Sequence, residues 1–309
     1  MCLTDHFWQF LVPGLTLGAL YALVAIGYTL VYGVLQLINF AHSEVFMSGG
    51  FGGLFVTQAL VGSGGTPHGF DSVLYMITGI AIGAVVGGCL AFLLERVAYR
   101  PLRRRNAPRL VYLITAIGAS IFLFNLTGKM FGRDKTNIPE LYTDGVIFRL
   151  FGAQVRVQQI VIVVTAVVMM VLLDTVVSRT KLGAGIRAVA QDAQTASLMG
   201  VNINRVISQT FVIGGLLGGA AGFLFGSYLN VHYQMGFLPG IKAFAAAVLG
   251  GIGNIRGAML GGLLLGIVEN LSQSCMSSQW IDVIAFIVLI LVLMFRPTGI
   301  LGQRLGRAA

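Results

Sequence analysis

The stretch that decides the fold runs from residue 30 to residue 56 and reads LVYGVLQLINFAHSEVFMSGGFGGLFV. Glu44 is its single formal charge, and just one other charge lies between residues 7 and 94. A segment this apolar spans a bilayer, and an ionisable group within it is costly enough to need a reason. The surroundings of this chain are therefore expected to be lipid. Glu44, with Asn39 and His42 beside it, is expected to meet something other than lipid.

The composition of the whole chain agrees with a membrane protein. Of its 309 residues, 56% are hydrophobic and 10% are charged, whereas a soluble domain usually carries about 25% charged residues. Apolar stretches of roughly twenty residues recur along the chain, so residues 1–309 are expected to form a single transmembrane domain. No Lys or Arg precedes the first apolar run, which argues against a cleaved signal peptide. The basic residues gather between apolar runs, which encodes membrane orientation, so nucleic acid is not an expected partner.

The expected fold class is all-α, a polytopic helical bundle with about eight spanning or re-entrant segments and glycine-rich broken helices. We expect these segments at residues 8–34, 36–60, 72–94, 110–128, 157–177, 207–230, 241–268 and 279–296. Residues 95–109 hold six arginines and one glutamate, and residues 178–206 are also basic, so both are expected to be cytoplasmic loops. Residues 129–156 then form an external loop.

These assignments conflict near the C-terminus. The basic tail after Phe295 is expected inside, but single crossings from residue 207 onward would leave it outside. One segment must therefore enter and leave on the same side. Residues 241–268 are the best candidate, because VLGGIGNIRGAMLGG interrupts them and a broken helix is tolerated where protein or a cavity covers its backbone. Residues 36–60 are open to the same interpretation, so the side of the N-terminus stays open.

Small residues recur at four-residue spacing on three expected helices. They are Gly214, Gly218, Gly222 and Gly226; Gly14, Gly18 and Ala22; and Gly83 with Gly87. Such stripes let helix backbones approach closely in a membrane. We interpret them as packing within the chain rather than as subunit interfaces.

The polar group Asn39, His42 and Glu44 has two interpretations of equal weight. An amide, an imidazole and a carboxylate within six residues are able to line or gate a translocation pathway. The alternative is a structural network that ties a broken helix to its neighbours. A zinc protease motif is excluded, because the second histidine of HExxH is absent.

The glycine-rich break at residues 248–262 superficially resembles a dinucleotide-binding loop. The GxGxxG spacing fails because Arg256 stands where the third glycine is required. A break in a membrane helix exposes backbone groups that can face a cavity, so the candidates for the pathway or gate include Gly250, Gly251, Gly253 and Asn254. Lys242 and Glu269, on either side, are interpreted as ordinary anchors at the two interfaces.

The basic segment 178–206 carries Asp192, Ala196 and Gly200 at four-residue intervals. A short helix would place these residues on one face, where another protein could approach closely, with Arg187 beside them. A solvated loop that merely sets orientation needs basic residues but no periodic row of small ones. We therefore predict a docking segment.

Several chemistries find no support in the sequence. The chain contains no GxxxxGK[ST] phosphate loop and no GxSxG elbow, and its four histidines are scattered. No catalytic residue, metal site or cofactor is therefore predicted. If ATP hydrolysis drives this protein, another chain must bind and hydrolyse the ATP.

Five blocks of sequence, in order, carry a resemblance to one family. They begin with GLTLGALYALVAIGYTLVYGVLQLINFAHSEVFM and ERVAYRPLR, and continue with IRAVAQDAQTASLMGVNINRVI, KAFAAAVLGGIGNIRGAMLGGLLLGIVE and RPTGILG. The chain resembles the LivH-type permeases of bacterial high-affinity branched-chain amino acid ABC importers. The resemblance implies a second homologous permease chain, two cytoplasmic ATPase subunits, an external substrate-binding protein and contact with lipid of the bacterial inner membrane. It also implies that residues 187–201, with Asp192, Ala196 and Gly200, dock on an ATPase.

The chain departs from the family at three positions. Ser43 stands where the family often has glycine, Gln191 where it often has glutamate, and Arg256 where it often has proline. Two alternatives stay open: a related importer for urea or amides, and a stand-alone carrier that uses Glu44 and Glu269 as ion sites.

Overall fold

The computed structural model describes residues 2–62, 70–139, 141, 146–150, 152–274 and 280–302. Within these ranges, seven helices are long and apolar enough to cross a membrane, which confirms the polytopic helical fold class. The chain divides into two compact units, which are described separately below. Unit 1 comprises Met1–Thr29, Val146–Asp174 and Lys242–Ala309, and unit 2 comprises Leu30–Gly145 and Thr175–Ile241.

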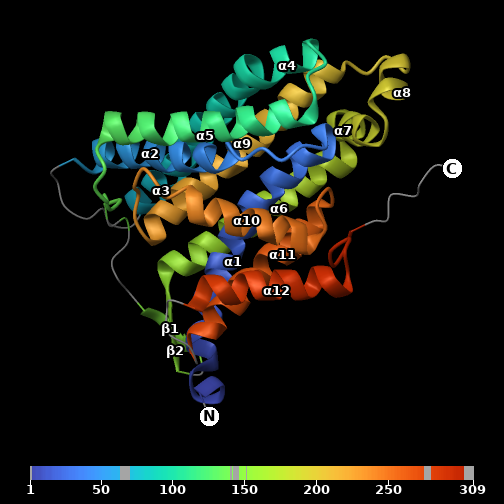
Figure 1. Ribbon diagram of the computed structural model, residues 1–309. Coiled ribbons are helices and arrows are strands. Elements are labelled where there is room, and N and C mark those ends of the chain that lie inside the picture. Colours follow the sequence, from blue (N-terminus) through green and yellow to red (C-terminus); the bar gives the residue numbers. More distant parts are fainter. Residues whose placement is uncertain are drawn as a thin grey trace. The chain divides into compact units, whose positions relative to one another are not determined.

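Figure 1 shows the helices in chain order. They are α1 (Cys2–Leu35), α2 (His42–Val61), α3 (Phe70–Leu94), the π-helix η1 (Glu95–Tyr99), α4 (Arg100–Arg104), α5 (Arg109–Phe131), α6 (Val157–Arg179), α7 (Lys181–Gln191), α8 (Ala193–Leu198), α9 (Ile203–Tyr228), α10 (Phe237–Gly250), α11 (Ile255–Gln273) and α12 (Ile281–Phe295). The strands β1 (Val146–Leu150) and β2 (Ala153–Arg156) pair antiparallel, with Leu150 opposite Ala153.

Two segments expected as loops are largely helical. Residues 95–104 continue α3 through η1 and α4, and residues 181–198 form α7 and α8. Arginine, alanine and glutamine all have good helix propensity, so a basic segment need not be irregular. The expected span 36–60 is also shifted, because the helix begins at His42 and residues 36–41 are irregular.

In unit 2, the helices α2, α3 and α9 pack on one another through glycine, with α5 beside α2 (Figure 1). A Cβ atom on Gly219 would overlap the Gly83 carbonyl oxygen, and one on Gly222 would overlap that of Phe46. The backbones are therefore in direct contact, as small residues allow in membrane helices. The interpretation of this stripe as packing within the chain is confirmed.

In unit 1, α1 packs on α11 in the same way. A Cβ atom on Gly18 would lie 2.8 Å from the Leu263 carbonyl oxygen, and one on Gly262 would overlap the Ala22 backbone. The stripe that begins at Gly14 therefore also serves packing within the chain.

The segment 241–268 is a helical hairpin within unit 1. The end of α10 is bonded to residues that follow α12, with the amide of Ile300 donating to the Leu249 carbonyl at 2.9 Å. At the opposite end of the hairpin, Lys242 of α10 contacts Glu269 of α11. The two helices therefore run in opposite directions, as a segment that enters and leaves on the same side requires, and the placement of this segment relative to a membrane stays a prediction.

Candidate functional site

The irregular residues 36–41 join α1 to α2 and are held by Asn39. The side-chain oxygen of Asn39 accepts a hydrogen bond from the backbone N–H of Ala41 at 3.1 Å and from the Tyr99 hydroxyl at 2.6 Å. Asn39 and Tyr99 are both buried. A buried amide oxygen with two donors is satisfied, and it fixes the chain where the helix is interrupted.

The neighbours of α2 show that this helix begins beside the middles of two long helices. Glu44 accepts a hydrogen bond at 3.0 Å from Ser120, which is the middle residue of α5. The ring of His42 lies against Gly218, in the middle third of α9, where an added Cβ atom would be 3.2 Å from the His42 Cε1 atom. Discontinuous helices that begin at such a position are typical of transporters, because their exposed N–H groups can face a substrate.

Asn39, His42 and Glu44 do not point at one common centre. Asn39 bonds to η1, His42 contacts α9 and Glu44 bonds to α5. Glu44 Oε1 also accepts from Ser43 at 3.3 Å, whereas its buried Oε2 atom has no hydrogen-bond partner among the described residues. The contacts of Asn39 fit the structural network, and Glu44 is the group with hydrogen-bonding capacity to spare.

The break between α10 and α11 has two residues in the left-handed region, Gly251 and Gly253, with φ of 107° and 96°. Glycine adopts this conformation without steric cost. Asn254 then caps α11, because its side-chain oxygen accepts from the backbone N–H groups of Arg256 and Gly257 at 3.1 and 3.3 Å. The predicted break in a membrane helix is therefore confirmed.

The residues after α12 cover this break. The amide of Leu301 donates to the Gly250 carbonyl at 2.9 Å, and the Asn254 side-chain NH₂ donates to the Leu301 carbonyl at 2.8 Å. These backbone groups thus bond to protein rather than face an open cavity. A pathway role for Gly250, Gly251, Gly253 and Asn254 stays a prediction.

The expectation that Lys242 and Glu269 are interfacial anchors is wrong. The Lys242 ammonium lies 2.7 Å from Glu269 Oε1 and 2.6 Å from Asp282 Oδ1, and both Lys242 and Glu269 are buried. The Tyr21 hydroxyl donates to the same Glu269 oxygen at 3.5 Å. Charges buried this deeply need partners, and the lysine supplies one for each carboxylate. Glu269 Oε2 has no hydrogen-bond partner among the described residues, but the ammonium paired with this carboxylate already balances its charge, so Glu269 is a poor candidate for a free ion site.

Arg256, which replaces the family's frequent proline, is paired at the surface of unit 1. Its Nε and Nη2 atoms donate to the two carboxylate oxygens of Asp174 in α6, at 3.2 and 3.1 Å. The Arg256 side chain is 71% exposed and that of Asp174 is 32% exposed. The added charge therefore does not enter the broken segment, and this departure leaves the geometry of the break intact.

The predicted docking face at 192–200 is also wrong in its geometry. Asp192 caps α8 and its carboxylate accepts from the N–H of Gln194 at 2.8 Å, but Gly200 lies beyond the helix with φ of 86°. Ala196 points into a buried cluster with Ile186 and Phe211. A four-residue repeat fixes which residues share a face, but it does not say whether that face is exposed. The Arg187 side chain donates to the Val177 carbonyl within unit 2.

The exposed residues of this segment are different ones. Leu198 and Met199 are 88% and 81% exposed, more than any other large apolar side chain among the described residues. They stand where α8 ends, outside the long apolar helices. Sequence reasoning missed them, although the pair is apolar and lies within a basic, polar segment. An exposed apolar pair in such a place is a candidate contact for another protein.

The pKa of Asp192 supports its role as the cap of α8. Hydrogen bonds from the Thr195 side chain and from the backbone N–H groups of Thr195 and Gln194 hold the pKa of this carboxyl below its ordinary value. Asp192 is therefore ionised at neutral pH, and its first contribution is local: it fixes the start of α8.

Apolar spans, glycine contacts and interrupted helices together define a multi-pass helical membrane protein of the transporter class. Residues 10–293 match the family model described as "Branched-chain amino acid transport system / permease component". The chain belongs to this family, whose members are transporter subunits and not enzymes.

Individual relatives match over nearly the whole chain. It is 46% identical to the high-affinity branched-chain amino acid transport system permease protein BraD of Pseudomonas aeruginosa, and the match covers 96% of each chain. It is 43% identical to the permease protein LivH of Escherichia coli K12, again over 96% of each chain. A probable permease of Methanocaldococcus jannaschii is 28% identical over 92% of this chain and 89% of its own length. No solved structure gave a significant match.

Proposed function

We propose that this chain is a permease subunit of an ABC importer that carries leucine, isoleucine or valine across the bacterial inner membrane. The observation that carries this proposal is 43–46% identity over 96% of the length of permeases named for branched-chain amino acid transport. The sequence offers no phosphate loop of its own, so ATP hydrolysis is assigned to two cytoplasmic partner subunits. A second permease chain and an external binding protein complete the assembly.

The proposed mechanism is alternating access without covalent chemistry. ATP binding brings the two ATPases together, and their motion is transmitted to the permease through α8. The pathway then opens to one side at a time. A ligand shifts such an equilibrium only by its differential affinity for the two states, so the binding protein is expected to favour one of them.

The interruption at 36–41 is the proposed element along the route. The helix that follows it, α2, begins beside the middles of α5 and α9, and discontinuous helices of this kind form the substrate site in transporters. Glu44 Oε2, buried and without a partner among the described residues, is suited to accept a hydrogen bond from the ammonium group of an amino acid. Gln at this position keeps the Ser120 contact but loses the charge. If Glu44→Gln leaves uptake unchanged from pH 5 to pH 8, the structural interpretation is the better one.

The docking proposal is tested with Leu198→Ser/Met199→Ser, since both side chains are exposed and the change leaves the buried cluster intact. The chain is co-expressed with its partner subunits and reconstituted in liposomes. We expect normal membrane insertion but a loss of at least tenfold in ATP-driven uptake. Lys181→Ser, an exposed polar change in the same basic segment but outside residues 187–201, is the control and should retain uptake. Full uptake by the double variant would remove the docking proposal.

The assignment to ABC importers, rather than to secondary carriers, is tested by omitting the ATPase subunits, the second permease chain and the binding protein. Liposomes that hold the purified chain alone are given an ion gradient and radiolabelled leucine, and in parallel the assembled transporter is given ATP and its binding protein. Uptake is expected only in the second case. Concentrative uptake by the chain alone would establish a secondary carrier. If the assembled transporter takes up urea but not leucine, the substrate is an amide and not a branched-chain amino acid.

A further inference from the structure

The helix that leaves the apolar span α3 changes its winding at a cluster of arginines. The π-helical turn η1 (Glu95–Tyr99) is followed directly by α4 (Arg100–Arg104). Arg96, Arg100 and Arg104 recur every fourth residue along this stretch. Single π-helical turns inside α-helices occur frequently at functional sites, and like charges at this spacing repel one another unless an anion compensates them.

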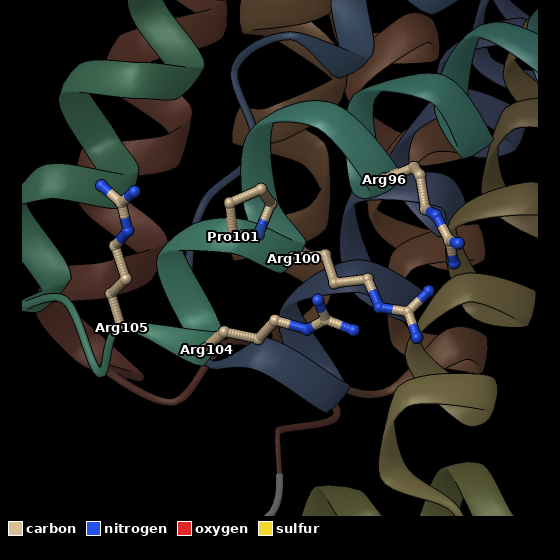
Figure 2. Close-up of a pocket in the computed structure, with 5 residues that line it drawn as sticks. All are labelled: Arg96, Arg100, Pro101, Arg104 and Arg105. Carbon is tan, nitrogen blue, oxygen red and sulfur yellow. The ribbon is translucent and has the colours of Figure 1, made fainter.

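These arginines line one cavity. Its volume is about 300 Å³, and its lining residues are Arg96, Arg100, Pro101, Arg104 and Arg105. In Figure 2 the guanidinium groups of Arg96, Arg100 and Arg104 extend to the same side, whereas Arg105 extends the other way. A volume of this size is at the lower end for small-molecule sites, so it suits a headgroup rather than a whole lipid.

The acidic residue nearest in sequence does not neutralise the cavity. The Glu95 carboxylate bonds to Arg103 at 2.9 Å and to the Ser208 hydroxyl at 2.6 Å. Among the described residues, the recorded ion pairs of this segment involve Arg103 and none of the arginines that line the cavity. The Nε atom of Arg100 is buried without a hydrogen-bond partner in the same part of the chain. The arginines that line the cavity therefore have no ion-pair partner among the described residues.

The surroundings of the cavity favour a lipid as the source of that acceptor. Leu93 and Val97, on the same helix, are 54% and 66% exposed, and Leu110 at the start of α5 is 64% exposed. Apolar side chains this exposed on membrane helices face acyl chains. The arginines thus stand where the lipid-facing surface gives way to the charged segment, which is where headgroups lie. Basic pockets beside membrane helices on the cytoplasmic side bind anionic headgroups, and arginine matches the geometry of phosphate oxygens.

We propose that the cavity formed by Arg96, Arg100 and Arg104 binds the phosphodiester headgroup of an anionic phospholipid of the inner leaflet. The proposal goes beyond amino acid transport, and it rests on the expected cytoplasmic placement of residues 95–109. A bound headgroup relieves the repulsion among the three arginines. The orientation signal alone requires positive charges but no shared cavity.

The test titrates the purified full-length chain with phosphatidylglycerol in detergent and counts retained lipids by native mass spectrometry. Phosphatidylcholine and inorganic phosphate are titrated in parallel. We expect preferential retention of phosphatidylglycerol, and a loss of affinity on the order of 100-fold in Arg96→Gln/Arg100→Gln/Arg104→Gln, since each basic residue contributes roughly a factor of five. Arg96 and Arg104 are exposed, so replacing them should not impair folding. If the triple variant fails to fold, Arg96→Gln/Arg104→Gln is tested in its place, with an expected loss of affinity of roughly 25-fold.

The matched control removes three positive charges from the other basic segment. Arg179→Gln/Lys181→Gln/Arg205→Gln changes exposed residues outside the cavity and should alter the affinity by less than threefold. Equal losses of lipid affinity in both triple variants would show that the lipid responds to positive charge anywhere on the chain, and would overturn the proposal. If inorganic phosphate displaces the lipid at equal concentration, the cavity is a site for free anions and the lipid proposal is wrong. If the arginine variant retains its lipid but no longer co-purifies with ATPase subunits, the cavity serves a protein partner and the proposal is wrong.

Discussion

Replacing Lys242 by methionine tests whether the charges buried in unit 1 depend on one another. Methionine keeps the length and the apolar stem of the side chain but removes the ammonium group. That group lies 2.7 Å from Glu269 Oε1 and 2.6 Å from Asp282 Oδ1. Glu269 would then be buried with only the long contact from the Tyr21 hydroxyl, at 3.5 Å.

The size of the effect follows from burial. The side chains of Lys242 and Glu269 are 9% and 6% exposed, and removing one partner of a buried pair costs about 3–5 kcal/mol. The contact to Asp282 adds little, because that side chain is 47% exposed and exposed ion pairs contribute at most about 1 kcal/mol. We expect Lys242→Met to lose about 3–5 kcal/mol of the free energy of unfolding. Lys242→Met/Glu269→Gln should recover most of it, because no unpaired carboxylate remains buried.

The measurement is reversible unfolding of the purified chain in mixed micelles, followed by circular dichroism as dodecyl sulfate is added. Arg256→Met is the control, since it breaks an ion pair whose arginine is 71% exposed and whose aspartate is 32% exposed, and its effect should be much smaller than that of Lys242→Met. A Lys242→Met protein as stable as the parent would refute the reasoning. So would a double variant no more stable than the single one.

Three further outcomes are expected. Gly219→Val should abolish folding, seen as loss of monodisperse protein in detergent, because α3 and α9 are in backbone contact there, whereas Gly118→Ala, with open space around it, should not. Tyr99→Phe should cost about 1 kcal/mol in the same unfolding measurement, because the Asn39 oxygen loses one of its two donors. The lowered pKa of Asp192 stabilises α8 above its ordinary pKa, and this contribution disappears as the pH falls through the lowered value. Thermal stability of the parent should therefore fall below about pH 4, and Asp192→Asn should flatten that fall.

The sequence predicted the architecture well, because spans and breaks of membrane helices depend on local sequence patterns. Apolar runs of the right length predict spans, and glycine clusters such as Gly251 and Gly253 predict breaks without any knowledge of neighbours. The basic tail and the count of crossings predicted a segment that turns back on itself, and α10 and α11 do run in opposite directions. These features need no information about which residues meet across the fold.

Contacts between distant segments could not be predicted in this way. Lys242 meets Glu269 and Asp282 across separations of 27 and 40 residues, and no local pattern shows that these three residues lie together. The burial of Ala196 and the exposure of Leu198 likewise depend on how α8 packs against α9, not on its four-residue repeat. The available signal was the energetic cost of a lysine within an apolar run, which favours a buried partner over an anchor.

The burial of Ala196 gives α8 a route to the interrupted helix. Ala196 belongs to one packed cluster with Phe211 and Tyr99, and the Tyr99 hydroxyl holds Asn39 in the segment that joins α1 to α2. A push on α8 by an ATPase would therefore reach the interrupted segment 36–41 through side chains in contact, and packed cores switch between discrete arrangements rather than deform continuously. Tyr99→Phe keeps the packing but removes the final hydrogen bond. In the reconstituted importer it should leave ATPase association and hydrolysis intact while uptake per ATP falls; unchanged coupling would mean that α8 acts on the pathway by another route.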